Sequence, residues 1–395
     1  MTSKSVIMLW LNGGPATIDL WDLKRGHENG GPFREIATNV PGMNISEHLP
    51  KLSAVGSEFS IIRSMSTREG DHSRARFVST TGYVPQGAIK FPSVGSLVAH
   101  EFDEELDRDI PSYVHVGGRP RITNGGFLGP KYAPFIVGGG GGRPGIMDAA
   151  PAELKVSDLK PASEISEGRQ AMRLELSSEL RGLSVIPAGS PVVDALDSAN
   201  DRARRLMRPE AVAAFDLHQE DEALREAYGK GSFGQGCLMA RRLVERGVRF
   251  VEVSLDGWDT HANNFERVKE LSHQLDWGFA TLLTDLKQRG LLESTLVVCQ
   301  GEFGRTPRIN GQAGRDHWPA SWAAVLAGAG IRGGQVVGAT SEDGIRVESK
   351  PTRTSDLMAT AFKSIGLDPL KQNMSNVSRP IRLADPNGKP IEELL

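Results

Sequence analysis

Short, continuous apolar runs limit what this 395-residue chain can fold into more than any other feature of its sequence. Val6–Leu11 contains no polar residue and is followed directly by Asn12 and two glycines. A strand buried on both faces of a parallel sheet reads as such a run, whereas a half-exposed strand alternates apolar and polar residues. Val6–Leu11 therefore predicts a central parallel strand that ends in a tight loop.

A long helical pattern lies between two further strand-like segments in the C-terminal half. Apolar residues recur at steps of three and four over residues 268–286, which is typical of a helix with one buried stripe. Val248–Leu255 precedes this helix and Thr295–Cys299 follows it, and this order favours a right-handed crossover and a parallel sheet. Further elements are expected at Phe59–Arg63, Tyr113–Val116 and Trp322–Leu326 as strands and at residues 73–80 as a helix. We therefore expect one α/β domain over residues 1–395 with a mostly parallel central sheet.

Three regions depart from this alternating pattern. Gly117–Ala150 is rich in glycine and proline, including the run Gly138–Gly142, and is expected to be a loop insertion without a regular element. Residues 166–246 have helical patterns with interleaved charges, which indicate a solvated helical face. Residues 117–235 are thus expected to be an accessory insertion within the domain. The tail after Ser375 is polar and is expected to be a loop.

Composition argues against several classes of function. The formal net charge is −3 and aromatic residues make up 6 %, so we expect no nucleic-acid or membrane partner. Cys237 and Cys299 lie in apolar patterns and are expected to be buried, which excludes a disulfide scaffold and disfavours a cysteine metal site. Val6–Leu11 is too short for a signal sequence or a membrane span. A cytoplasmic chain is therefore expected, or an exported one if a leader has been removed.

Polar side chains follow the carboxyl ends of the expected strands, which is where open parallel sheets form their sites. Several separate loops that deliver histidines and carboxylates to one edge are how this architecture builds a metal site. The candidate residues, in chain order, are Asn12, Asp71, His72, Ser73, Asp256, Asp259, His261, Glu302, Arg305, Asp316 and His317.

Asp259 and His261 are the strongest candidates for metal ligands. Alternate residues of an extended segment point the same way, so the two side chains could bind one ion, and His317 offers a third group. The alternative is that Asp259 caps the following helix while His261 packs against Trp258. Asp316 could be a ligand or could simply orient the neighbouring His317.

Glu302 is a lone carboxylate at a strand end. It could ligate a metal, or it could pair with Arg305 or Arg308. Both possibilities stay open on the sequence alone.

The start of the helix expected at residues 73–80 is a candidate anion site. Exposed N–H groups at a helix start attract phosphate or sulfate, and Arg74 and Arg76 could add donors for an oxyanion. The alternative is that Asp71 or Ser73 only caps the helix. Neither a dinucleotide-binding motif nor a Walker motif is present.

These residues together resemble a known bacterial family, the domain-of-unknown-function family number fifteen hundred and one. The resemblance covers about residues 5–370, and the segment around 302–319 is very specific to the family. The matching segments are LNGGPATIDLWD, NISEHLP, IRSMST, GFLGP, FGQGCLMARRLVERGVRFVEV, WDTHANNF, LVVCQGEFGRTPRINGQAGRDHWP and GIRGGQVVGAT. The family belongs to the alkaline-phosphatase-like superfamily with the sulfatases, which implies a three-layer sandwich with a mostly parallel central sheet.

The resemblance also implies roles for residues near the expected helix. It places His72 in the position of the superfamily nucleophile and Arg76 in the position of an arginine, with Ser73 one residue from the usual serine. No cysteine lies there, so a formylglycine sulfatase mechanism is disfavoured.

The superfamily ligands are only partly retained. Asn12 stands where the superfamily has an aspartate, and the pair Glu302-Phe303 stands where it has Asp-His. Other candidates resemble one of the two usual metal positions: Asp259, His261 and His317. One metal site is therefore expected, whereas the usual two-metal site is not.

The leading hypothesis is a metal-dependent hydrolase of phosphate or sulfate esters. It would use zinc, manganese or calcium as a divalent ion, and an anionic small molecule or sugar ester as substrate. One alternative is a non-catalytic member of the fold that binds an anionic ligand or a polysaccharide. Another is a metal-dependent phosphotransferase or mutase.

Overall fold

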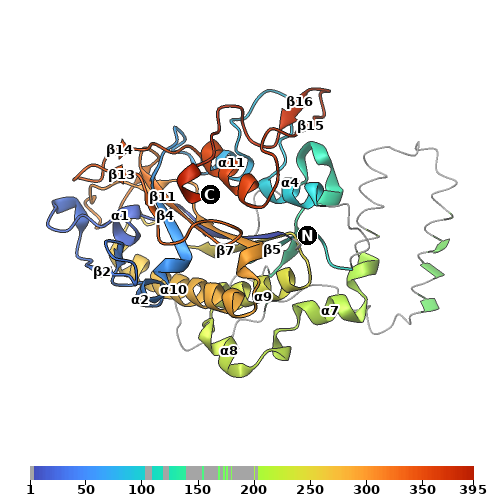
Figure 1. Cartoon of the computed structure of the whole chain (residues 1–395). Helices are drawn as coiled ribbons and strands as arrows, with labels where there is room; N and C mark the ends of the chain where they lie inside the picture. The colour runs from blue at the N-terminus through green and yellow to red at the C-terminus, as the bar shows by residue number, and fades with distance from the viewer. Residues whose placement is uncertain are drawn as a thin grey trace.

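An eight-stranded sheet organises the computed structural model, which describes residues 4–102, 109–118, 124–138 and 203–395 and isolated residues between 154 and 200. The strand order is β12-β4-β11-β8-β1-β7-β5-β6 (Figure 1). At the centre, β1 (Ser5–Asn12) pairs in parallel with β7 (Phe250–Asp256) and β8 (Thr295–Gln300). Next to β7, β5 (Tyr113–Val116) and β6 (Phe135–Val137) extend the sheet in the same direction. The predicted α/β fold with a mostly parallel sheet is thus confirmed.

One strand of the mostly parallel sheet runs against the others, and it is the strand expected at Trp322–Leu326. β11 (Trp322–Ala327) is antiparallel to both β4 (Phe59–Met65) and β8. The chain between β8 and β11 holds only the short ladder of β9 (Gly304–Arg305) and β10 (His317–Trp318), without a crossover helix. Because a parallel neighbour needs such a crossover, the chain returns antiparallel. On the far side of β4, β12 (Val336–Val337) is parallel to it.

Helices cover both faces of the sheet and explain the continuous apolar run of β1. Ile7, Leu9 and Leu11 belong to the core under α9 (Ser232–Glu245) and α10 (Asn264–Gln288). The alternate residues of β1 belong to the core under α4 (Val94–Glu101) and α11 (Thr354–Ser364). In Figure 1, α9 and α10 lie below the sheet, and α4 and α11 lie above it. Cys237 and Cys299 are both buried and free, as predicted.

The remaining elements are short. They connect the large elements or flank the sheet. Their bounds are α1 Thr17–Leu20, β2 Glu35–Ala37, β3 Asn44–Ser46, α2 Pro50–Ala54, α3 His72–Thr81, α7 Pro209–Phe215, α8 Glu222–Ala227, β13 Ala339–Thr340, β14 Val347–Ser349, β15 Gln372–Met374 and β16 Pro380–Arg382.

Two segments expected to lack regular structure contribute to the fold. Within the segment 117–150, Phe135–Val137 forms β6, because a three-residue edge strand can pair with β5 without an alternating pattern. Residues 139–142 of the glycine run lie outside the described residues. In the polar tail, β16 pairs with β15, and Leu383 and Leu394 are buried in the core under α11.

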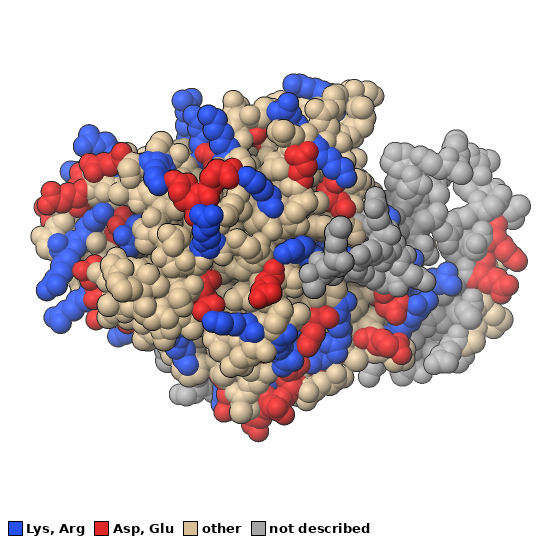
Figure 2. Space-filling model, in the orientation of Figure 1, with Lys and Arg blue, Asp and Glu red and all other residues tan. Residues whose placement is uncertain are grey.

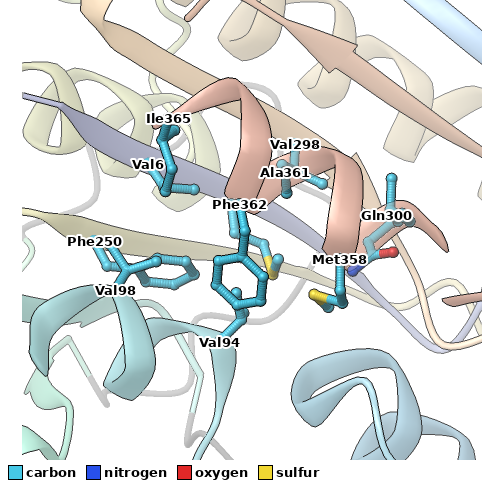
Figure 3. Close-up of a pocket in the computed structure, with 12 residues that line it drawn as sticks. Val6, Val94, Val98, Phe250, Val298, Gln300, Met358, Ala361, Phe362 and Ile365 are labelled. Carbon is cyan, nitrogen blue, oxygen red and sulfur yellow. The ribbon is translucent and has the colours of Figure 1, made fainter. Parts of the chain in front are cut away.

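A small apolar cavity lies between α11 and the sheet. Figure 3 shows Met358 and Phe362 of α11 facing Val98 and Phe250 around it. Its volume is about 10 Å³, which is room for about one water molecule. An organic ligand cannot enter a cavity of this size.

The outer surface is mixed in charge on the face shown in Figure 2, where basic and acidic side chains are interspersed. Within the part of the chain that is described, no helix is both long enough and apolar enough to cross a membrane.

Candidate metal centre

Three side chains of types that can bind a metal come from separate parts of the chain and meet at the edge where the parallel strands end. His72 begins α3, Asp259 lies in the loop after β7, and His317 is the first residue of β10. Their ligand atoms all lie within 4.8 Å of one another. His72 Nε2 lies 3.3 Å from Asp259 Oδ2, and His317 Nε2 lies 3.3 Å from Asp259 Oδ1.

His261 also contacts two of these three side chains. Its Nε2 lies 3.0 Å from His317 Nε2 and 3.1 Å from Asp259 Oδ1. The geometry therefore brings together the three residues that the sequence singled out, Asp259, His261 and His317. We call these three residues and His72 the cluster. The side chains of Asp259 and His261 are 46 % and 45 % exposed, so the cluster opens to solvent on their side.

The other ring nitrogen of each histidine is held by an acceptor. His72 Nδ1 lies 2.7 Å from Glu302 Oε1, and His261 Nδ1 lies 2.7 Å from Asp316 Oδ1. His317 Nδ1 lies 2.8 Å from the carbonyl oxygen of Gly70. A carbonyl or carboxylate oxygen only accepts, so the partners assign the ring proton to Nδ1 and a lone pair to Nε2 in each neutral ring. The lone pairs of all three Nε2 atoms then face the cluster, where they could bind a metal ion.

Glu302 and Asp316 therefore lie behind the imidazoles that they hold. Glu302 is 1 % exposed, and both its carboxylate oxygens also accept the N–H of Gly13, at 3.1 and 3.2 Å. Such outer partners fix the ring orientation and tautomer of a metal-binding histidine. This geometry favours positioning roles for these two carboxylates, which the sequence nominated as ligands.

Neighbouring groups set the charge states within the cluster. Burial alone would raise the pKa of Asp259, but the hydrogen bond and the charge of Arg305 lower it overall. The hydrogen bond with Glu302 raises the pKa of His72, whereas burial lowers the pKa of His317. His72 Nε2 is buried without a hydrogen-bond partner in the described structure, as expected of a donor that awaits a cation.

Two buried arginines hold the loops that carry the cluster. Arg305 donates to Asp259 and to the carbonyl oxygens of Gly13 and Gly14. Arg315 forms a buried ion pair with Asp19 at 2.8 and 2.9 Å. These contacts fasten the 304–318 segment to α1 and to the loop after β1.

The other nominated residues lie near this edge but have different partners. The amide of Asn12 donates to Asp256 Oδ1 at 2.7 Å. Arg76 is buried, and its guanidinium stacks over the ring of Trp10 at 4.9 Å. Neither side chain has a contact with the cluster in the described structure.

Asp71 caps the start of α3, where an anion was expected. Its carboxylate accepts the N–H groups of Arg74 and Ser73 at 3.0 Å each, and these hydrogen bonds lower its pKa. An anion at this helix start would have to displace the Asp71 carboxylate.

Sequence reasoning placed His72 at this edge, but in the position of a nucleophile and not of a metal ligand, and it did not identify Phe303 as a neighbour of His72. The ring centroid of Phe303 lies 4.9 Å from that of His72 and 4.7 Å from that of His317. The usable signal for His72 was its place at the start of α3, in the connection that follows β4 at the same edge of the sheet. Nothing in the sequence pattern indicated that the Phe303 ring packs against both imidazoles.

Comparison with protein families accounts for nearly the whole chain. The family described as "Protein of unknown function (DUF1501)" matches residues 3–395. The chain belongs to the DUF1501 family. This confirms the predicted family. Comparison with curated proteins finds no match.

Several solved structures are similar to this DUF1501 chain at low sequence identity. A sulfatase, PsFucS1 from Pseudoalteromonas sp., is 14 % identical, with 92 % of this chain and 68 % of that chain covered and a TM-score of 0.42. A phosphonate monoester hydrolase from Silicibacter pomeroyi is 12 % identical, with 98 % and 76 % covered and a TM-score of 0.39. A protein in the alkaline phosphatase superfamily from Vibrio parahaemolyticus is 11 % identical, with 93 % and 67 % covered and a TM-score of 0.40.

Proposed function

We propose that this chain is a metal-dependent hydrolase that acts on phosphate or sulfate esters of small anionic molecules or sugars. One observation carries the proposal: three imidazole Nε2 atoms and one carboxylate converge at the open edge of a parallel sheet. Open sheets of this kind bind substrates beyond the carboxyl ends of their strands. The choice of ester class comes from the family resemblance of the sequence.

The cluster has the parts that such a reaction needs. A divalent ion bound there would supply Lewis acidity toward an ester oxygen. Glu302 and Asp316 hold His72 and His261 in the orientation that presents Nε2. Arg305 keeps Asp259 ionised, and the exposed side of the cluster gives a substrate access.

A second candidate function is a non-catalytic role in binding an anionic ligand or polysaccharide. Two contacts favour it: the Asn12 amide is bound to Asp256, and the Phe303 ring packs against His72 and His317. Phe303 offers no ligand atom to a second ion, and Asn12 offers only an uncharged amide oxygen, whereas many hydrolases clamp their substrate between two ions.

The test compares the parent with His317→Ala. His317 is partly exposed in a two-residue strand, so its loss should change the melting temperature of the metal-free protein little. We expect the parent to hold metal and to hydrolyse an aryl phosphate or aryl sulfate, and the variant to lose both properties. His273→Ala, an exposed change on α10, is the matched control and should keep both.

Elemental analysis, melting and ester hydrolysis are measured side by side. A parent that hydrolyses no ester with any divalent metal would favour the binding role. A variant that keeps stoichiometric metal and full turnover would remove His317 from the site. A variant that fails to fold would show that His317 is structural.

A further inference from the structure

The cluster also indicates which class of metal it takes. We propose that it binds one zinc-class transition-metal ion per chain and excludes calcium and magnesium. This inference rests on the proposed metal site, but it does not depend on ester hydrolysis. It is carried by the kind of donor atoms, by their spacing, and by what packs around them.

The donor atoms are mainly nitrogen. Three of the four side chains present imidazole Nε2, and only Asp259 presents oxygen. The two carboxylates behind them are already engaged, because Glu302 binds His72 and Gly13 while Asp316 binds His261. Calcium needs six to eight oxygen ligands and magnesium needs an octahedral shell of oxygens, whereas imidazole suits zinc and its neighbours.

The spacing of the donors fits a small tetrahedral ion. Atoms bonded to zinc at about 2.0–2.1 Å in a tetrahedron lie about 3.3–3.4 Å apart. The two contacts of Asp259 with His72 and His317 are both 3.3 Å. His261 Nε2 lies 3.1 Å from Asp259 Oδ1 and 3.0 Å from His317 Nε2. His261 Nε2, His317 Nε2 and Asp259 Oδ1 thus give three distances close to the edges of one coordination shell. His72 approaches the other oxygen, Oδ2, of the same carboxylate, and its ligand atom lies within 4.8 Å of that of His317.

Hydrogen bonding alone does not explain the closest of these contacts. Both His261 and His317 direct Nδ1–H to an acceptor, so in the neutral rings two Nε2 lone pairs face each other at 3.0 Å. Such a contact is repulsive unless a cation or an extra proton lies between the nitrogens. A metal ion bonded to both nitrogens and to the Asp259 carboxylate satisfies all three atoms.

The surroundings leave room for one ion. The Phe303 ring packs against His72 and His317 on one side of the cluster. Gly14 permits this packing, because a Cβ there would lie 2.7 Å from the Phe303 ring. In the ranges that the structure describes, no second group of histidine and acidic side chains has the spacing of a metal site. The stoichiometry should therefore be one ion per chain.

The test measures metal binding directly. The full chain is stripped with a chelator and then offered Zn²⁺, Co²⁺, Mn²⁺, Ca²⁺ or Mg²⁺ singly, and bound metal is counted after desalting. We expect one zinc or cobalt per chain, a visible cobalt spectrum of the four-coordinate type, and no displacement of zinc by excess calcium. His72→Ala should lose the bound ion and the cobalt spectrum, whereas the surface variant His273→Ala should retain both.

Three outcomes of the metal-binding measurements would overturn the proposal. Calcium that binds as tightly as zinc, two ions per chain, or an unchanged cobalt spectrum in folded His72→Ala would each do so. If His72→Ala does not fold, His72→Gln is measured in its place under the same criteria. Zinc bound without ester hydrolysis would sink the proposed reaction but not this inference. Hydrolysis supported by calcium alone would overturn this inference but would leave the proposed reaction standing.

Discussion

Glu302 lies behind an imidazole of the proposed metal site, where it can orient that ring without being a ligand itself. It accepts hydrogen bonds from His72 Nδ1 and from the Gly13 N–H, and it is almost fully shielded from solvent. Replacing it with glutamine keeps the shape of the side chain but removes the charge that holds the proton on Nδ1. We expect Glu302→Gln to weaken zinc binding about 10–100-fold, as is usual for partners of this kind.

A competition titration against a chelator measures this change in affinity. The variant should still bind one ion at high zinc concentration. If Glu302→Gln removes the bound ion altogether while the fold is kept, Glu302 is a ligand, as the sequence first suggested.

Phe303 is expected to hold two imidazoles by packing alone. Its ring is fully buried against His72 and His317. We expect Phe303→Leu to reduce zinc affinity by about 10-fold, because the two rings gain freedom that binding must remove. Phe279→Leu, an equally buried change in α10, is the control and should lower the melting temperature without changing the affinity. Equal zinc affinities in the two variants would mean that Phe303 only fills the hydrophobic core.

At the residue scale, the sequence predicted the members of the site that directly follow strands. Asp259 and His261 come shortly after β7, so the topology alone placed them at the edge. The partners of His261 and His317 could not be predicted, because Asp316 and Gly70 meet them only after two loops have folded. Which carboxylate binds a metal and which binds an imidazole depends on these distances.

At the scale of elements, the segment between β8 and β11 depends on one buried ion pair. Asp19 and Arg315 are both fully buried, and Arg315 also donates to the carbonyl oxygens of Thr306 and Pro307. Asp19→Ala would leave a buried guanidinium without its counter-charge. We expect the free energy of unfolding to fall by about 3–5 kcal/mol and zinc binding to weaken, because the segment carries His317.

Urea unfolding and zinc titration of Asp19→Ala check this expectation. Glu393→Ala is the control, because its ion pair with Lys350 is exposed and should contribute at most about 1 kcal/mol. An Asp19→Ala variant as stable as the Glu393→Ala variant would contradict the structural role of the buried pair.

The apolar pattern of the sequence predicted where the main strands and helices lie, but it predicted less well how the strands pair. Val6–Leu11 and Thr295–Cys299 became central strands because both faces of the sheet are covered. The direction of β11 did not follow from its own residues, since an apolar run does not indicate whether the strand pairs in parallel or antiparallel. It was set by the connection from β8, which contains no crossover helix.

At the scale of the whole molecule, the C-terminal tail completes the layer formed by α4 and α11. Leu383 and Leu394 are buried there, although the few apolar residues of this polar segment form no periodic pattern. Polar contacts also attach the tail. Asn373 donates to Glu101 at 2.8 Å, and Lys371 Nζ lies 2.6 Å from the same carboxylate. Glu101 therefore links the end of α4 to the tail.

This link should make stability depend on pH in acid. Burial alone would raise the pKa of Glu101, but hydrogen bonds from His100, Lys371 and Asn373 lower it to about 2. Because the pKa is lower in the folded state than in the unfolded state, the link contributes fully above about pH 4.5. Its contribution is lost as the pH falls toward about 2, where the carboxyl group becomes protonated in the folded chain as well.

Glu101→Gln removes the titrating group, so the variant should be less stable than the parent at pH 7. Between about pH 4.5 and 2 its free energy of unfolding should decline less steeply, so that the two curves converge. Urea unfolding at a series of pH values gives both curves. Glu342→Gln changes an exposed glutamate and should leave the parent curve nearly unaltered. Parallel curves for the parent and Glu101→Gln would mean that the tail is held by its apolar contacts alone.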